Sequence, residues 1–131
     1  MVRTEGDIVT ALWRYVMSSI LPANISGRVY KSTDRPVNST KEDIVIKPLA
    51  NLPKQKQEGF INVNIYVPDI MDEGQYNKDG DRCDLLERVA VEVLEVFDVE
   101  DIRFTLDTQH TLEVEQAHLI NNKILFNLIN E

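Results

Sequence analysis

The 131-residue sequence contains a single cysteine, Cys83, and no long apolar run. One cysteine excludes a framework of internal disulfides and is typical of a reducing compartment. A helix that spans a membrane needs about 18 or more consecutive apolar residues, and no segment approaches that length. The first residues also lack the charged, apolar and small-residue pattern of a secretory leader. We therefore expect a protein of a reducing compartment that has no membrane as a partner.

The sequence motifs of common enzyme classes are also missing. It contains no G-x-S-x-G elbow, P-loop, dinucleotide-binding glycine pattern or H-E-x-x-H motif. The histidines, His110 and His118, are separated by a predicted turn, and zinc would need additional ligands of suitable geometry. Cys83 lies at a predicted helix start, which lowers a thiol pKa, but Asp81 and Asp84 oppose that effect. We therefore expect no enzymatic activity, with a hydrolase that uses Cys83 and a histidine as an alternative.

The acidic segment around Gly80 invites comparison with a calcium-binding loop. Aligning Gly80 with the invariant glycine of such a loop puts Gln75, Asn77 and Asp79 on its first three ligand positions. Leu86 then occupies the position that needs a bidentate glutamate. Because the first and last ligands fail, we expect no dedicated metal site and no cofactor.

Charge is plentiful but unevenly distributed. The net charge is −8, whereas binding to nucleic acid phosphates needs a basic surface, so nucleic acid is not expected as the main ligand. Residues 69–101 hold twelve acidic and three basic side chains, and residues 28–58 hold seven basic and four acidic ones. Unlike patches on one molecule favour head-to-tail self-association. Plain solvation of helix faces and loops is the alternative.

The clearest structural pattern is the alternation between Gly59 and Pro68. One face of this segment is β-branched (Ile61, Val63, Ile65 and Val67) and the other is polar or aromatic (Phe60, Asn62, Asn64 and Tyr66). A period of two predicts a half-buried strand, which Gly59 and Pro68 bracket. Asparagines keep the second face out of the core, so we expect Asn62, Asn64 and Tyr66 to face water or a partner.

The short β-branched segment 43–47 is predicted to be the antiparallel neighbour of this strand, with the chain leaving the sheet at Pro48. The connection 50–58 is longer than a tight turn needs. Protruding loops of this kind are often functional, which makes Lys54 and Lys56 candidate interface residues. A solvated loop is the alternative.

An amphipathic helix is predicted near the N-terminus. Asp7 is its expected N-cap and Pro22 its expected stop. Its apolar stripe consists of Ile8, Ala11, Leu12, Tyr15 and Val16. Trp13 belongs to a second stripe beside the first, and it is assigned either to the core or to a subunit contact, where tryptophan is enriched.

A second helix is predicted to begin at Asp81 or Asp84 and to extend to Phe97. Its apolar face consists of Leu85, Leu86, Val89, Ala90, Val93, Leu94 and Phe97. We expect this face to cover the β-branched side of 60–67, where each buried side chain contributes about 1.5–3 kcal/mol.

The remaining segments complete the expected sheet. Strands are predicted at 28–31, 102–106 and 123–129, and 111–115 is either an extended segment or a further strand. Segment 32–42 is expected to be a surface loop, and the turn-rich acidic segment 69–84 is expected to be mobile. The predicted fold class is therefore α+β: one domain with a mostly antiparallel sheet and two helices packed on one face.

In this order of elements, the chain resembles the tail terminator (tail completion) proteins of long-tailed bacteriophages and prophages. The features that carry the resemblance are the helix 7–17, the strand pair 43–46 and 60–67 with its extended loop, the helix 85–97, and His118-Leu119 before Lys123-Ile124-Leu125-Phe126. The resemblance covers nearly the whole chain in architecture and includes no catalytic fingerprint. The acidic segment 69–84 departs from it.

The resemblance implies a non-enzymatic virion assembly protein that caps the tail tube as a ring, expected to be hexameric, and joins it to the head connector. Its partners would be further copies of itself, the tail tube protein and the head connector protein, with assembly in the bacterial cytoplasm. Candidate interface residues are Trp13, Lys54, Lys56, Asn62, Asn64, Tyr66, Asp72 and Glu73. The alternative is a monomeric α+β module that binds a small ligand or a regulatory partner protein.

Overall fold

The structure, a computed structural model, describes residues 4–32, 34–49 and 58–129. Its elements are α1 (Glu5–Ser18), the 3-10 helix η1 (Pro22–Asn24), β1 (Val29–Lys31), β2 (Asp43–Pro48), β3 (Glu58–Pro68), β4 (Ile70–Asp72), β5 (Gln75–Asn77), α2 (Gly80–Leu94), β6 (Val96–Val99), β7 (Ile102–Val114) and β8 (Ala117–Leu128). Within these residues, six strands form one curled sheet in the order β1-β2-β3-β8-β7-β6, and β4 pairs with β5. Apart from the parallel pair β1–β2, neighbouring strands are antiparallel. The predicted α+β class is confirmed.

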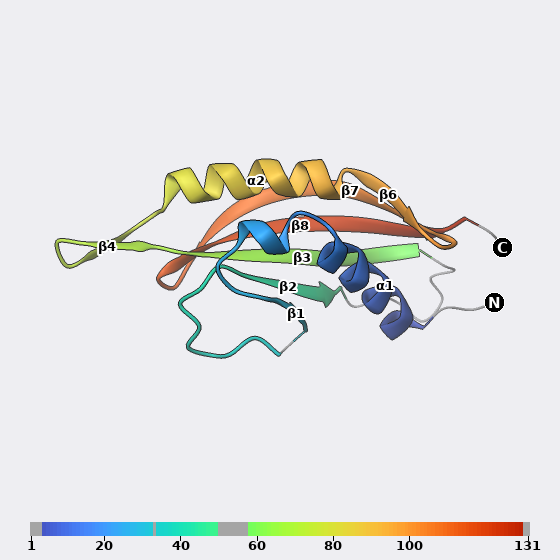
Figure 1. Ribbon diagram of the computed structural model, residues 1–131, viewed down its shortest axis with the longest axis horizontal. Coiled ribbons are helices and arrows are strands. Elements are labelled where there is room, and N and C mark those ends of the chain that lie inside the picture. The colour runs from blue at the N-terminus through green and yellow to red at the C-terminus, as the bar shows by residue number, and fades with distance from the viewer. Residues whose placement is uncertain (1–3, 33, 50–57, 130–131) are drawn as a thin grey trace.

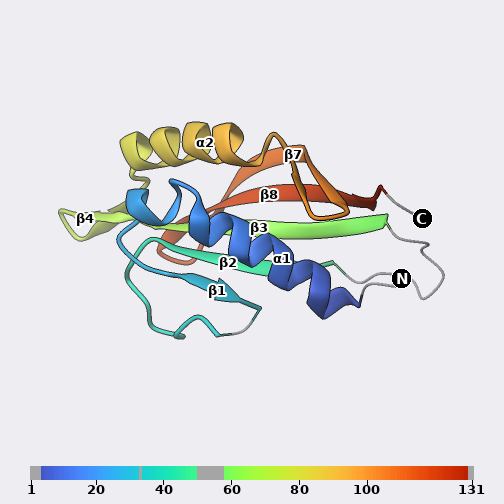
Figure 2. The same ribbon diagram turned by 45° about the vertical axis from the view of Figure 1, so that its right-hand side comes forward.

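The two α-helices pack on one face of the sheet (Figures 1 and 2), with α1 against β1 and β2, and α2 against β7, β8 and β3. The hydrophobic core lies between the helices and this face, which we call the core face. The opposite face, which we call the open face, has no helix over it in the described part of the chain. Among the described residues, no helix is long and apolar enough to cross a membrane.

The predicted strand between Gly59 and Pro68 is confirmed as the centre of the sheet. Ile65 pairs with Ile44 of β2 and with Ile120 of β8, and all three side chains are fully buried on the core face. Since successive strand residues point to opposite faces, Asn64 lies on the open face. The prediction that 43–47 forms the antiparallel neighbour of this strand is also confirmed.

The start of α1 differs from the prediction. Thr4 is the N-cap, and Asp7 lies at the third helical position of a capping box. The Asp7 amide donates to Thr4 Oγ1 (3.0 Å), and the Thr4 amide donates to the Asp7 carboxylate (3.1 Å). Both residue types are good N-caps, so the sequence alone did not separate them. The helix ends at Ser18, and Pro22 instead begins η1.

The bounds of α2 also need correction. Its N-cap is Asp79, which accepts a hydrogen bond from the Arg82 amide (3.2 Å), rather than Asp81 or Asp84. The helix ends at Leu94, and the residue predicted to extend it, Phe97, lies in β6. Phe97 stacks between Tyr15 of α1 and Phe104 of β7, with ring centroids 3.7 and 5.0 Å away.

Two further segments fold differently from the prediction. Segment 69–84, expected to be mobile, contains the β4–β5 hairpin and the first turn of α2. The segments 102–106 and 111–115 are not separate, because β7 runs through both as one strand to Val114. A register shift between Leu106 and Thr108 marks a bulge at Asp107, which interrupts the alternation of the sequence. The predicted C-terminal strand is confirmed as part of β8.

Candidate functional site

The open face holds three of the predicted interface residues. Asn62, Asn64 and Tyr66 are half-buried along β3 on this face. Asn64 lies opposite Asn121 of β8, whose amide group donates a 2.7 Å hydrogen bond to Asn64 Oδ1. These side chains therefore form part of a polar surface, and none of the three lies in a sealed interior.

Cations lie over the aromatic rings of this face. The Arg35 guanidinium carbon lies 4.1 Å from the ring centroid of Tyr66, and Lys123 Nζ lies 4.2 Å from that of Phe60. Such placements allow cation–π attraction of about 0.5–1 kcal/mol at exposed sites. Arg35 belongs to the connection between β1 and β2, so this connection bends over one side of the open face.

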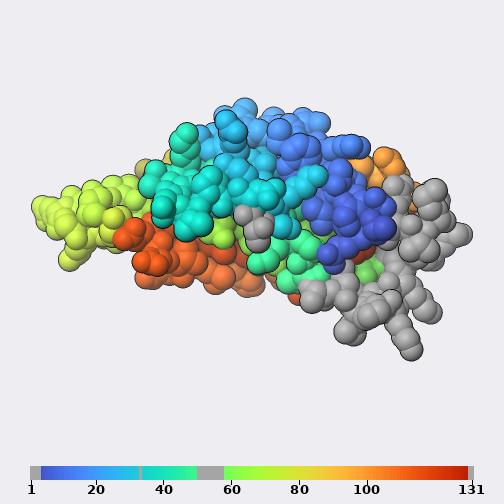
Figure 3. All heavy atoms as spheres, turned by 90° about the horizontal axis from the view of Figure 1, so that it is seen from below, coloured from blue at the N-terminus to red at the C-terminus, as the bar shows by residue number. Residues whose placement is uncertain are grey.

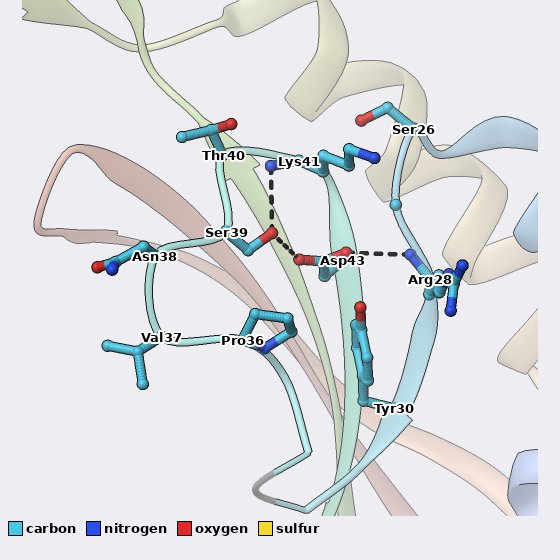
Figure 4. A pocket seen from close by; sticks show the side chains of 11 residues that line it. Ser26, Arg28, Tyr30, Pro36, Val37, Asn38, Ser39, Thr40, Lys41 and Asp43 are labelled. Atoms are coloured by element: carbon cyan, nitrogen blue, oxygen red, sulfur yellow. Dashed lines mark hydrogen bonds between the residues drawn. The ribbon is translucent and has the colours of Figure 1, made fainter.

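The same connection encloses a pocket of about 700 Å³, which we call the loop pocket. Its walls include Arg28, Tyr30, Pro36, Val37, Lys41 and Asp43 (Figure 4). Asp43, only 1% exposed, accepts hydrogen bonds from the Arg28 amide (3.0 Å), from Arg35 Nε (3.1 Å) and from the Ser39 hydroxyl. One buried carboxylate therefore fixes both sides of the pocket.

Segment 32–42 was predicted to be a surface loop, and none of these pocket residues was predicted. A signal was present in the adjacent acids Glu42 and Asp43, which come directly before an apolar strand. Acidic side chains at the edge of a core are rarely buried unless they are paired, so they predict nearby cations or hydrogen-bond donors.

Two other predicted interface residues, Asp72 and Glu73, lie on the β4–β5 hairpin. We call residues 70–77 the arm, because they extend beyond the main sheet (Figures 1 and 3). Glu73 and Gly74 connect the two strands with φ of 48° and 78°, as a type I′ turn requires. Every residue of β4 and β5 is exposed.

The arm is attached to the sheet through Asp69. The Asp69 amide donates to the carbonyl oxygen of Gln116 (3.0 Å), in the turn between β7 and β8. Its carboxylate lies 2.8 Å from Nδ1 of His118, and both side chains are largely buried. These contacts fix the direction in which the arm leaves the sheet.

Trp13 is separated from these surfaces, because it lies on the core-face side of the sheet. Its indole Nε1 donates to the carbonyl oxygen of Val29 (3.2 Å), and Lys31 Nζ lies 5.0 Å from its ring centroid. Trp13 thus packs α1 against β1, which fits the core assignment. Lys54 and Lys56, with the loop around them, lie outside the described residues.

The residues considered for chemistry lie apart. Cys83 is fully buried, and burial raises the pKa of its thiol to about 11, so it is protonated at neutral pH. His118 contacts Asp69, and His110 lies opposite Asn121 on the open face. Within residues 4–32, 34–49 and 58–129, no group of three or more His, Cys, Asp or Glu side chains is arranged to hold a metal ion.

Comparison of the chain with protein-family models and with curated proteins finds no match. A function for the chain is therefore inferred from its fold and from three surfaces: the open face, the loop pocket and the arm.

Proposed function

We propose that the protein is a non-enzymatic virion assembly protein that caps the tail tube of a long-tailed phage or prophage as a ring and joins it to the head connector. The order α1, β2, β3, α2 and β8 is the order of elements on which the resemblance to tail terminators depends. The observation that carries the proposal is this order of elements. The projecting arm lies in segment 69–84, which departs from the resemblance. It supports assembly with other molecules, because among the described residues it forms no hydrogen bond or ion pair with another element.

Ring assembly needs two different surfaces on each copy, one that meets the next copy and one that meets the previous copy. The arm and the loop pocket provide unlike surfaces of this kind. The open face then supplies a third surface, with Asn62, Asn64 and Tyr66 available to the tail tube protein or the head connector protein. Aromatic side chains such as that of Tyr66 are enriched in protein interfaces, and the rims of interfaces are polar.

The loop pocket also supports a second candidate function, a monomeric module that binds a small ligand or a regulatory partner protein. Its volume of about 700 Å³ lies within the range of about 300–1,000 Å³ that is usual for ligand sites. Its walls mix Tyr30, Pro36 and Val37 with the cations Arg28 and Lys41, which would suit an anionic ligand with an apolar part.

Light scattering of the purified protein over a range of concentrations, combined with electron microscopy, tests the proposal. We expect rings to form as concentration rises, and we expect added protein to shorten tubes of the tail tube protein encoded in the same genome. A protein that stays monomeric and leaves tube length unchanged contradicts the proposal and favours the binding module.

Charge reversal at Lys54 and Lys56 gives a sharper form of this test. The pair Lys54→Glu and Lys56→Glu should weaken ring formation and leave the circular dichroism of the monomer unchanged. The matched control is Arg14→Glu with Arg88→Glu, which makes the same change in net charge at exposed positions of the two helices. Equal assembly of both variants would remove Lys54 and Lys56 from the interface.

A further inference from the structure

Three large apolar side chains of the short arm are exposed to solvent. Ile70, Met71 and Tyr76 are 50%, 55% and 46% exposed. Met71 and Tyr76 form a cross-strand pair on one side of the arm, and Ile70 lies on the other side. A lone two-stranded hairpin is marginally stable in water, so strands of three residues gain much from a partner that covers them.

The arm does not fold back on its own chain. Asp69 holds its base against Gln116 and His118, and the arm extends away from the sheet (Figure 3). No hydrogen bond or ion pair in the described part of the chain joins residues 70–77 to another element. Within the described part of the chain no element covers Ile70, Met71 and Tyr76, so burying them would take a second molecule.

The loop pocket is complementary to the arm in both charge and apolar character. The end of the arm carries Asp72 and Glu73, both exposed. The pocket carries exposed Arg28 and Lys41, and no ion pair to either side chain is found among the described residues. Such pairing of unlike charges sets orientation and excludes wrong partners.

The pocket also presents apolar side chains. Pro36 and Tyr30 lie on either side of it, whereas Val37, which is 94% exposed, points outward at its rim (Figure 4). A pocket of about 700 Å³ has room for the side chains at a hairpin end. An apolar wall flanked by two cations therefore matches an apolar hairpin that ends in two acids.

We propose that the arm of one copy docks in the loop pocket of the next copy, with Asp72 and Glu73 facing Arg28 and Lys41 of that copy. This inference rests on the proposed function in one respect, since it names the contact through which copies of the chain meet. The contact is heterologous, so each copy gives an arm to one neighbour and a pocket to the other.

A charge-exchange experiment on the full chain tests the contact. The arm variant carries Asp72→Lys and Glu73→Lys, and the pocket variant carries Arg28→Glu and Lys41→Glu. Each alone places like charges in the contact and should weaken self-association by about tenfold or more in sedimentation velocity. An equimolar mixture should associate again, because each reversed arm then meets a reversed pocket and each native arm a native pocket.

A control and a second variant make the outcome decisive. Glu92→Lys with Glu95→Lys, at an exposed position of α2 and at its exposed C-cap, changes the net charge as much as the arm variant does and should leave association unchanged. Met71→Ser with Tyr76→Ser removes the apolar pair without changing charge and should also weaken association.

The possible failures are distinguishable. If the wild type forms rings and both charge variants form them equally well, or if the mixture does not restore association, the arm–pocket contact is wrong and the proposed function stands. If the mixture restores association but no variant or wild-type protein affects tail tubes, the contact stands and the proposed function is wrong. A wild type that is monomeric at every concentration overturns the contact.

Discussion

Arg82 in the first turn of α2 holds Glu42, which directly precedes β2, through two hydrogen bonds of 2.7 Å from Nε and Nη2. Arg82 Nη2 also donates to the carbonyl oxygen of Asn24 (2.6 Å). The hydrogen bond to Glu42 raises the pKa of Arg82 above its ordinary value. This pair therefore connects the helix that follows the arm to the strand that forms the loop pocket, across 40 positions of sequence.

The substitution Arg82→Ala should destabilise the protein by about 2–3 kcal/mol, because it leaves the buried Glu42 carboxylate without its cation. Urea unfolding followed by circular dichroism measures the change. Arg88→Ala is the matched control, since Arg88 lies on the exposed side of the same helix and should cost less than about 0.5 kcal/mol. Equal costs at the two positions would show that the Glu42 contact contributes nothing to stability.

We expect Gly27→Ala to lower the stability of the protein more than Arg82→Ala does. A Cβ atom at this position would lie 1.9 Å from Asp43 Oδ1 and 2.5 Å from the carbonyl oxygen of Glu42, and the latter is backbone that a rotamer change does not move. The Gly27 amide donates to the same carbonyl oxygen (2.8 Å), so separating the two segments also breaks a hydrogen bond. We expect a loss of about 2–4 kcal/mol in the free energy of unfolding.

Gly80→Ala is the control for that substitution. A Cβ at Gly80 meets no atom within 4 Å, and alanine favours helix, so the change should be neutral or stabilise by up to about 1 kcal/mol. Thermal unfolding of the two variants measures the contrast. A Gly27→Ala protein as stable as Gly80→Ala would mean that segments 26–28 and 42–43 are not in close contact.

The sequence predicted those parts of the fold in which the local pattern alone decides whether a side chain lies on the core face or on the open face. In β3 each β-branched side chain is buried and each asparagine is on the open face, because alternation assigns faces without reference to any other segment. Phe97 was assigned wrongly because it continues the helical stripe at four residues from Val93. Its position in β6 depends on stacking with Tyr15, a contact far away in sequence.

The candidate site was predicted only in part for the same reason. Asn62, Asn64 and Tyr66 were placed on an uncovered face by local pattern alone. The loop pocket depends on contacts of Asp43 with Arg28 and Arg35, and no local period of the sequence reports them. Asp72 and Glu73 were named as interface candidates, but the hairpin that carries them was not predicted, because its acidic residues are also typical of a solvated loop.

The buried thiol of Cys83 gives a prediction for alkaline pH. Its pKa is raised from 9.0 to about 11, so between these values the unfolded chain loses the thiol proton while the folded chain keeps it. The contribution of this thiol to the free energy of unfolding is therefore fully present below pH 9. It falls by about 2 kcal/mol in all as the pH rises toward 11. Urea unfolding at pH 8 and pH 11 should show a larger loss for the wild type than for Cys83→Ala, and equal losses would contradict the burial of the thiol.

The same burial should make Cys83 slow to react with a thiol reagent such as DTNB. In the folded protein at pH 8 the thiol is protonated and inaccessible, so labelling should require unfolding. Labelling in urea should be complete within the mixing time. Rapid labelling without urea would indicate that α2 opens locally around Cys83.

The contact between Asp69 and His118 should determine how well ordered the arm is. In Asp69→Ala the carboxylate that holds the base of the arm is lost, while the strand pairs of β3 with β2 and β8 keep their own contacts. We expect faster hydrogen exchange of amides 70–77, unchanged exchange in β3, and a global cost of about 1 kcal/mol. The control Asp72→Ala removes a carboxylate from the end of the same arm and should leave exchange at its base unchanged. A disordered arm must become ordered when it docks, so Asp69→Ala should also weaken self-association. Unchanged hydrogen exchange together with normal association would show that the contact between Asp69 and His118 does not position the arm.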